Sequence, residues 1–290
     1  MAARLSRHLA CRRHSIRPLQ RRAAAGPSNV HQFAQEGFSR MSEYEKGRPT
    51  YPSSATKLLD RIFTKNLGAS TVVDLGAGTG KWTSTLVNYF QGPNTTAAKF
   101  QVHAVEPVVN FREVLRSKFS SCNEVVVHDG SAKDLTRLFR PGSINAISVA
   151  TAFHWFATEE VLQQFCDVLK PQGWVYLIWN VQVYDLEPEL RHHYPEIDER
   201  NEQFLRALKR KVVNTYHDET SPEMGKNNYR AMKGDILKLV NDFGLFGSGN
   251  EYQCFHNSMQ QLGDVDVVIN HVLSISSFGR RSEEEKELVR

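Results

Sequence analysis

The sequence predicts an α/β fold, in which a doubly wound, mostly parallel sheet carries helices on both faces. Three observations predict it. From residue 70 to 179 short apolar runs alternate with longer amphipathic stretches, as they do in successive β-α units. The first of these runs ends in a glycine-rich loop that opens a helix. The second ends in an acidic residue, Glu106, at the tip of its strand.

Each expected strand is an apolar run bounded by polar or turn residues, and the helices lie between the strands. The predicted strands cover residues 71–75, 100–105, 124–128, 145–150 and 174–179. The predicted helices cover residues 81–90, 108–119, 133–139 and 158–169. We interpret 169–173 as a helix end and turn, because Pro171 cannot continue a helix and Gly173 supplies the special backbone angles.

Residues 181–247 change character, because they are polar, rich in charge and contain helix-like stretches. They predict a helical cap inserted over one end of the sheet, so that one domain spans residues 29–290. An alternating stretch at 251–257 predicts a further strand, for a sheet of at most about seven strands.

The N-terminal 30 residues contain seven arginines and no acid, whereas the rest of the chain has 29 basic and 32 acidic residues. Residues 1–28 therefore resemble a mitochondrial transit peptide in composition, which predicts the mitochondrial matrix. A disordered basic arm on a cytoplasmic protein is the alternative. The weakly acidic body lacks the broad positive face that nucleic-acid binding needs.

Other features of the sequence bear on membrane-spanning, metal-binding and disulfide-rich proteins. No apolar run approaches the roughly 18 residues of a membrane-spanning helix. The four cysteines are far apart and show no CxxC or Cys/His ligand spacing, so no metal site or disulfide framework is predicted.

Glycines at alternate positions follow the first predicted strand, where residues 71–82 read TVVDLGAGTGKW. Such a loop lets the backbone approach a bound nucleoside closely. It is neither the dinucleotide GxGxxG pattern nor a phosphate loop, and it suits a cofactor without a pyrophosphate. Glu106, at the end of the second strand, could accept hydrogen bonds from the 2′ and 3′ hydroxyls of a ribose. A plain tight turn and a solvated strand end are the alternatives.

Together these segments resemble the class I S-adenosylmethionine-dependent methyltransferases, a Rossmann-like family, and within it the type 11 group similar to trans-aconitate methyltransferase. The resemblance rests on Tyr44-x-x-x-Arg48-Pro49-x-Tyr51-Pro52, Asp74 to Gly80, Glu106-Pro107, Phe153-His154-Trp155-Phe156 and Leu169-Lys170-Pro171-x-Gly173.

The resemblance implies S-adenosylmethionine as cofactor and assigns roles around it. The loop would wrap the methionine part and the ribose, Glu106 would hold the ribose hydroxyls, and the segment after the third strand would line the adenine. The implied cofactor-binding residues are Asp74, Gly76, Ala77, Gly78, Thr79, Gly80, Glu106, Pro107, Asp129, Gly130, Ser131 and Thr151. Asp129 as a plain turn residue is equally compatible with the sequence.

The acceptor is expected to be a small molecule, with a carboxylate oxygen as first choice and a quinone-ring precursor as second. A carboxylate is already ionised at neutral pH and needs positioning rather than a base. Arg48 is the candidate to hold either the acceptor carboxylate or the cofactor's own carboxylate, unless it only pins the N-terminal segment as a lid by a salt bridge. His154 is the candidate general base, unless it is a structural histidine. The expected substrate-binding residues are Tyr44, Tyr51 and Trp155.

A methyltransferase-like protein without catalysis, acting in mitochondrial assembly or regulation, is the alternative to an enzyme. Lys133 stands where many relatives have an acid on the adenine side. The chain also stops soon after the capping-box pattern of Ser282 and Glu285, where relatives continue into a last antiparallel strand. Both features favour that alternative.

Overall fold

The structure is a computed structural model that describes residues 45, 47–56, 59, 63, 70–92, 99–180, 235, 236, 238–240, 242 and 243. The predicted leader, nearly all of the predicted cap, the strand at 251–257 and Tyr44 lie outside the described residues.

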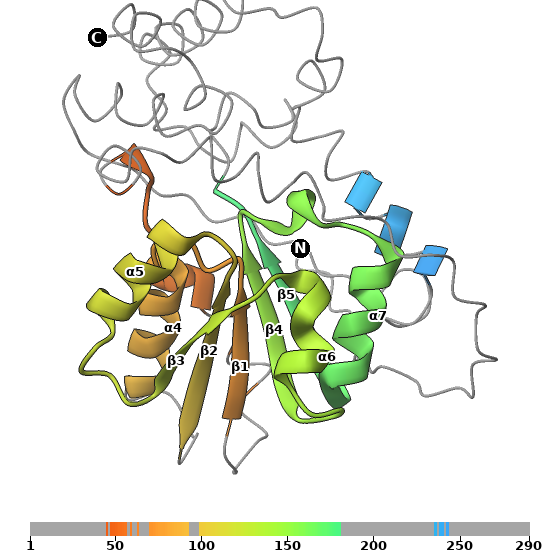
Figure 1. The fold of residues 1–290 in the computed structure, drawn as a ribbon, viewed down its shortest axis with the longest axis horizontal. Coiled ribbons are helices and arrows are strands. Elements are labelled where there is room, and N and C mark those ends of the chain that lie inside the picture. The colour runs from red at the N-terminus through yellow and green to blue at the C-terminus, as the bar shows by residue number, and fades with distance from the viewer. Residues whose placement is uncertain are drawn as a thin grey trace, which may run out of the picture.

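Five parallel strands form the sheet, in the order β3-β2-β1-β4-β5 (Figure 1). The doubly wound α/β fold class is confirmed. Each strand lies within a few residues of its predicted position, except that the fifth begins earlier. The strands are β1 Ser70–Leu75, β2 Phe100–Glu106, β3 Val125–Asp129, β4 Ile144–Ala150 and β5 Leu169–Ile178.

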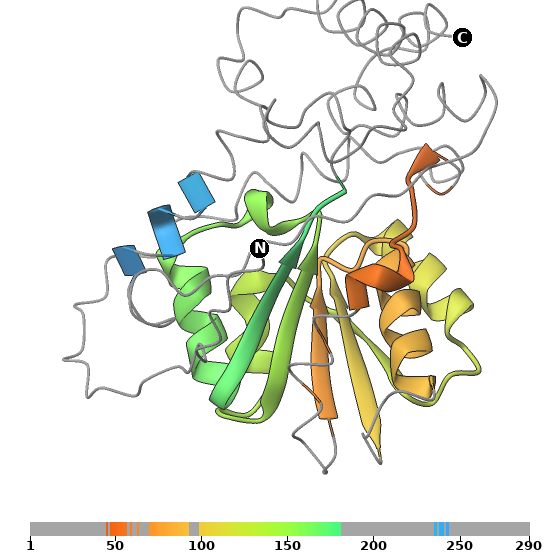
Figure 2. The same ribbon diagram turned by 180° about the vertical axis from the view of Figure 1, so that it is seen from behind.

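Helices cover both faces of the sheet, with α4 and α5 on one side and α6 and α7 on the other (Figures 1 and 2). The single helix predicted over 133–139 is corrected to a 3-10 turn followed by one short α-helix. The helices are η1 Ser53–Thr56, α4 Lys81–Gln91, α5 Val109–Lys118, η2 Ala132–Asp134, α6 Leu135–Leu138, η3 Phe153–Trp155 and α7 Glu159–Val168.

Two hydrophobic layers hold these helices to the sheet. Successive side chains of a strand point to opposite faces. Val72 accordingly packs in a buried cluster with Trp82 of α4. Its neighbour Val73 packs in the other buried cluster with Phe165 of α7. The central strand β1 therefore packs apolar side chains on both faces, as expected for a covered parallel sheet.

The start of β5 corrects the prediction for residues 169–173. These residues are assigned to the strand, with a register shift where Ile144 pairs with Leu169 and Ala146 pairs with Trp174. The left-handed residue is Gln172, at φ 65°, rather than Gly173. A Cβ on Gly173 would lie 2.9 Å from the carbonyl oxygen of Lys170, so glycine is needed there for close approach.

Two histidines face each other across β2 and β3. Nδ1 of His103 lies 2.8 Å from Nε2 of His128, and the ring of Phe139 meets both rings edge-on. Burial and the neighbouring His128 lower the pKa of His103 to about 4. Burial also lowers the pKa of His128. The folded protein therefore holds this pair neutral at neutral pH.

The pair predicts a loss of stability in mild acid. A histidine whose pKa is lower in the folded state takes up protons mainly on unfolding as the pH falls below its ordinary value near 6.5. The contribution of this pair to the free energy of unfolding should therefore fall between about pH 6.5 and pH 4. Urea unfolding across this range should show a steeper fall for the wild type than for His103→Gln. Equal slopes would contradict the prediction.

Candidate active site

The candidate site lies at the carboxyl edge of the sheet, at the top of Figure 1. The chain moves outward from β1 to β2 and β3, and then returns to the other side of β1 with β4. Open α/β sheets bind ligands at such a switch point, beyond the carboxyl ends of the strands. The predicted glycine loop, Glu106 and Thr151 all lie at this edge.

The glycine loop has a backbone that glycine favours. Gly76, Gly78 and Gly80 have φ values of 70°, 58° and 81°. A Cβ on Gly76 would lie 2.9 Å from the Cβ of Ala152, which follows β4. The N–H groups of Gly76 and Ala77 donate to the carbonyl oxygen of Val105, at 2.9 and 3.2 Å. The loop is therefore tied to β2 and passes close to β4.

Glu106 is 4% exposed, and its carboxylate faces the glycine loop. Oε2 accepts from the N–H of Gly78 and Oε1 accepts from the N–H of Val108, both at 2.8 Å. Burial raises the pKa of Glu106 to about 7, although these two N–H groups and Arg112 oppose that shift. Each carboxylate oxygen still has a lone pair available for a ligand hydroxyl.

Asp74 lies behind the loop, with a fully buried side chain. Its Oδ2 accepts from the hydroxyl of Thr83 in α4, and its Oδ1 has no hydrogen-bond partner among the described residues. Burial raises its pKa to about 7, and the charge of Glu106 adds to that shift. Asp74 therefore anchors the loop to α4. Thr79 is buried in the loop, and its carbonyl accepts from Lys118 Nζ at 3.5 Å.

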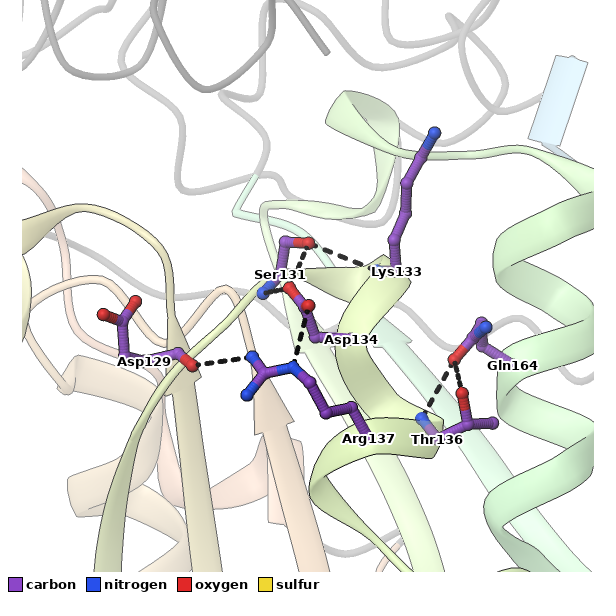
Figure 3. Close-up of polar contacts among 7 residues, drawn as sticks. All are labelled: Asp129, Ser131, Lys133, Asp134, Thr136, Arg137 and Gln164. Atoms are coloured by element: carbon purple, nitrogen blue, oxygen red, sulfur yellow. Dashed lines mark hydrogen bonds and ion pairs between the residues drawn. The ribbon is translucent and has the colours of Figure 1, made fainter. Parts of the chain in front are cut away.

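The segment after β3 is built around a capping box (Figure 3). Asp134 Oδ2 accepts from both the N–H and the hydroxyl of Ser131, each at 2.8 Å. A Cβ on Gly130 would lie 2.9 Å from Leu138 Cδ1, so the segment sits close on α6. Lys133 Nζ pairs with Glu160 at 3.1 Å. Asp134 is thus the acid whose hydrogen bonds shape this turn. It was not singled out from the sequence.

Arg137 and Gln164 fasten the same segment to its neighbours (Figure 3). Arg137 Nη2 donates to the carbonyl of Asp129 at 3.4 Å. Both the N–H and the hydroxyl of Thr136 donate to Gln164 Oε1 at 2.9 Å, which joins α6 to α7. The predicted adenine-side residues Asp129, Gly130 and Ser131 therefore lie next to Glu106, in a turn that these hydrogen bonds stabilise.

The other half of the edge, beyond β4 and β5, carries the predicted acceptor residues. The hydroxyl of Tyr51 lies 3.0 Å from Oγ1 of Thr151. Thr151 has a φ of 53°, a strained value for a β-branched residue. Its N–H donates to Ile178 at 2.7 Å, and its Oγ1 accepts from the N–H of Asn180 at 3.4 Å. These contacts bring the segment before η1 over the switch point.

His154 and Arg48 come together at this half of the edge. Burial and the Arg48 cation lower the pKa of His154 to about 4. Nδ1 of His154 accepts from Trp179 Nε1 at 3.4 Å, so the neutral ring carries its proton on Nε2. A ring in this state is a weak base at neutral pH and a good hydrogen-bond donor. The role of His154 as general base stays a prediction.

The aromatic residues of η3 differ in burial. Phe153 is fully buried in the core beside Phe165, as its apolar character predicts. Trp155 is partly exposed, and its ring lies 5.1 Å from that of His154. Trp155 can therefore still meet an acceptor, whereas Phe153 is structural.

A second residue at this edge was not singled out from the sequence. Arg112 of α5 is 6% exposed and reaches the ends of β2 and β3. The sequence did contain a sign that Arg112 is buried, because Arg112 shares the inward face of its helix with Phe111 and Leu115. A buried arginine needs partners, and only the folded chain shows which they are.

Comparison with known proteins identifies the domain that carries this edge. Residues 72–173 match the family described as a methyltransferase domain. They form a methyltransferase domain. The match covers both halves of the edge, from β1 to the bulge in β5, and it supports S-adenosylmethionine as the cofactor of the domain. It does not reach the segment of Arg48 and Tyr51. The likeness to trans-aconitate methyltransferase stays a prediction.

Curated relatives resemble the chain over about half of its length. An uncharacterised methyltransferase of Schizosaccharomyces pombe is 34% identical over 142 residues, which are 49% of this chain and 51% of the relative. One of Mycobacterium bovis is 33% identical over 144 residues, which are 50% and 51% of the two chains. The chain thus spans about half the length of the curated relatives it matches.

A solved structure is similar over a longer stretch. It is that of a candidate S-adenosyl-L-methionine-dependent methyltransferase from Methanococcus maripaludis, with a TM-score of 0.46 and 14% identity, covering 77% of this chain and 88% of that one.

Two further findings concern the described residues alone. None of their helices has both the length and the apolar character to cross a membrane. No group of three or more histidine, cysteine, aspartate or glutamate side chains among them could hold a metal ion.

Proposed function

We propose that the protein transfers the methyl group of S-adenosylmethionine to a small-molecule acceptor, with a carboxylate oxygen as the first choice. The observation that carries the proposal is the Glu106 carboxylate, which two backbone N–H groups aim at the glycine loop inside a methyltransferase domain. A buried acid held in this way is suited to bind the two hydroxyls of a ribose.

The residues on the nucleoside side fit this cofactor. Gly78 has a positive φ, and its N–H donates to the Glu106 carboxylate. The loop backbone and the acid therefore border the same space. The turn at 129–131 lies beside Glu106, because Glu106 and Asp129 are register partners in β2 and β3. Glu106 would hold the ribose, the loop would hold the methionine part, and 129–131 would line the adenine. The bound cofactor supplies a sulfonium methyl group for in-line displacement.

The acceptor half supports an anionic acceptor. The Arg48 cation adds to the effect of burial in lowering the pKa of His154, so a positive charge is present where the acceptor would approach. His154 then offers a neutral N–H donor rather than a base. A carboxylate needs no deprotonation near neutral pH, so a cation and a donor suffice to align its oxygen with the methyl carbon. Tyr51 and Trp155 would shape this pocket.

Methyl transfer tests the proposal directly. The full chain is incubated with S-adenosylmethionine labelled in the methyl group, and carboxylic acids are compared with phenols and amines. We expect base-labile label on carboxylic acids, and Arg48→Gln should raise KM for the acid more than it lowers kcat. Label on phenols alone would favour the quinone-ring precursor. Cofactor binding without any transfer would favour the non-catalytic assembly or regulatory protein.

The composition of residues 1–28 supports a further proposal, that the protein acts in the mitochondrial matrix. A fluorescent fusion of the whole chain should colocalise with a matrix marker, and removal of residues 1–28 should abolish this. Diffuse cytoplasmic signal from the whole chain would contradict it.

A further inference from the structure

Arg112 is a buried cation that joins the ends of two strands. Its Nη1 donates to the carbonyl oxygens of Glu106 and Pro107, at 3.0 and 2.6 Å. Its Nη2 lies 3.0 Å from Oδ2 of Asp129, the last residue of β3. The planar guanidinium can meet partners in these directions at once, which the ammonium of lysine cannot do with the same geometry.

These contacts hold the main chain of the residue whose carboxylate faces the glycine loop. Glu106 and Asp129 are the last register partners of β2 and β3. Arg112 grips the Glu106 main chain from the α5 side, while Gly78 and Val108 hold the carboxylate. If the turn after β2 moved, the carboxylate would move with it.

The charge of Arg112 reaches the same carboxylate. Arg112 lowers the pKa of Glu106, against the burial that raises it to about 7. The other charged groups that act at this place are Asp74 from β1, which interacts unfavourably with Glu106, and Asp129 from β3, which pairs with Arg112. Arg112 is therefore the cation that keeps Glu106 ionised nearer to neutral pH.

We propose that Arg112 is a positioning residue for the cofactor: through the carbonyls of Glu106 and Pro107 and the carboxylate of Asp129, it holds the ribose-binding acid in place. The inference rests on the proposed function, because it assumes that Glu106 binds a ribose. Arg112 itself touches no ligand in this account and acts through the turn and through its charge.

Two substitutions separate the effect of the Arg112 charge from that of its planar arrangement of donors. Arg112→Met removes both, and Arg112→Lys keeps the charge but loses the planar guanidinium. Arg116→Met is the matched control, because it removes the same charge from an exposed position one turn further along α5. S-adenosylhomocysteine, the demethylated product, is titrated into the full chain and each variant over a range of pH, and the melting temperature of each variant is recorded.

The expected result has three parts. Arg112→Met should bind the ligand about tenfold more weakly than the wild type at neutral pH, since a charged buried contact is lost. The pH at which its binding is half-maximal should move to more alkaline values, because Glu106 stays protonated longer. Arg112→Lys should bind less tightly without that pH displacement, and Arg116→Met should behave like the wild type.

Arg112→Met binding with the affinity and pH profile of Arg116→Met would overturn the inference. If Arg112→Met fails to fold, Arg112→Lys decides, and an affinity equal to that of the wild type would overturn the inference too. A folded wild type that binds no S-adenosylhomocysteine would instead overturn the proposed function, and this inference with it.

Discussion

Glu106→Ala should abolish cofactor binding in practical terms, with a loss of about a hundredfold or more in affinity for S-adenosylhomocysteine. Two hydrogen bonds from ribose hydroxyls to a carboxylate contribute about 1.5–3 kcal/mol each, and tenfold in affinity corresponds to about 1.4 kcal/mol. The Gly78 and Val108 N–H groups also lose their acceptor, so the loop loses its fixed shape. Equilibrium dialysis with labelled ligand measures the loss.

The matched control for this variant is Glu113→Ala, which removes an exposed acid from α5 and should leave affinity unchanged. Wild-type binding should also strengthen as the pH rises through about 7, because the pKa of Glu106 is raised to about 7 and its ionised form accepts the hydroxyls. Equal affinity of the two variants would contradict the assigned role of Glu106.

Gly80→Val should destabilise the fold and remove ligand binding together. The backbone at Gly80 has a φ of 81°, which is strained for any β-branched residue. A Cβ there would lie 2.7 Å from both Leu115 Cδ2 and Phe119 Cε2, so α5 would be pushed from the loop. Strain of about 1–3 kcal/mol and overpacking of about 1–3 kcal/mol together predict about 4 kcal/mol lost in the free energy of unfolding.

Gly142→Val separates backbone strain from overpacking against α5. Gly142 has a similar φ of 66° but lies in the turn before β4, away from the loop. Urea unfolding should show a smaller loss for Gly142→Val and unchanged ligand binding. If Gly80→Val were no less stable than Gly142→Val, the close contact with α5 would not hold.

Much of this fold was predictable from local patterns. The alternation of apolar runs located all five strands, because burial on both faces of a parallel sheet demands it. The glycine loop and Glu106 were predictable as neighbours, because parallel strands end at one edge.

The contacts between distant residues were not predictable in the same way. Tyr51 and Thr151 are 100 residues apart, and their hydroxyl contact depends on how the N-terminal segment crosses the sheet. Arg112 finds Asp129 only when α5 lies against β3. The low pKa of His154 likewise depends on burial and on Arg48, which no spacing reveals.

The residues with a positive φ show a second limit of prediction from the sequence. Gln172 and Thr151 have positive φ, although neither residue type favours it. The neighbouring Gly173 was the natural choice for the turn, yet its role is to let Leu169 and Lys170 approach. At Thr151, contacts with Tyr51, Ile178 and Asn180 accompany the departure from the local preference.

A crystal structure of the protein with S-adenosylhomocysteine tests the proposed cofactor site. We expect the ribose hydroxyls within hydrogen-bond distance of the Glu106 carboxylate, the adenine beside residues 129–131, and the sulfur facing the half of the edge that holds Arg48 and His154. A nucleoside bound elsewhere, or a ribose that makes no contact with Glu106, would contradict it.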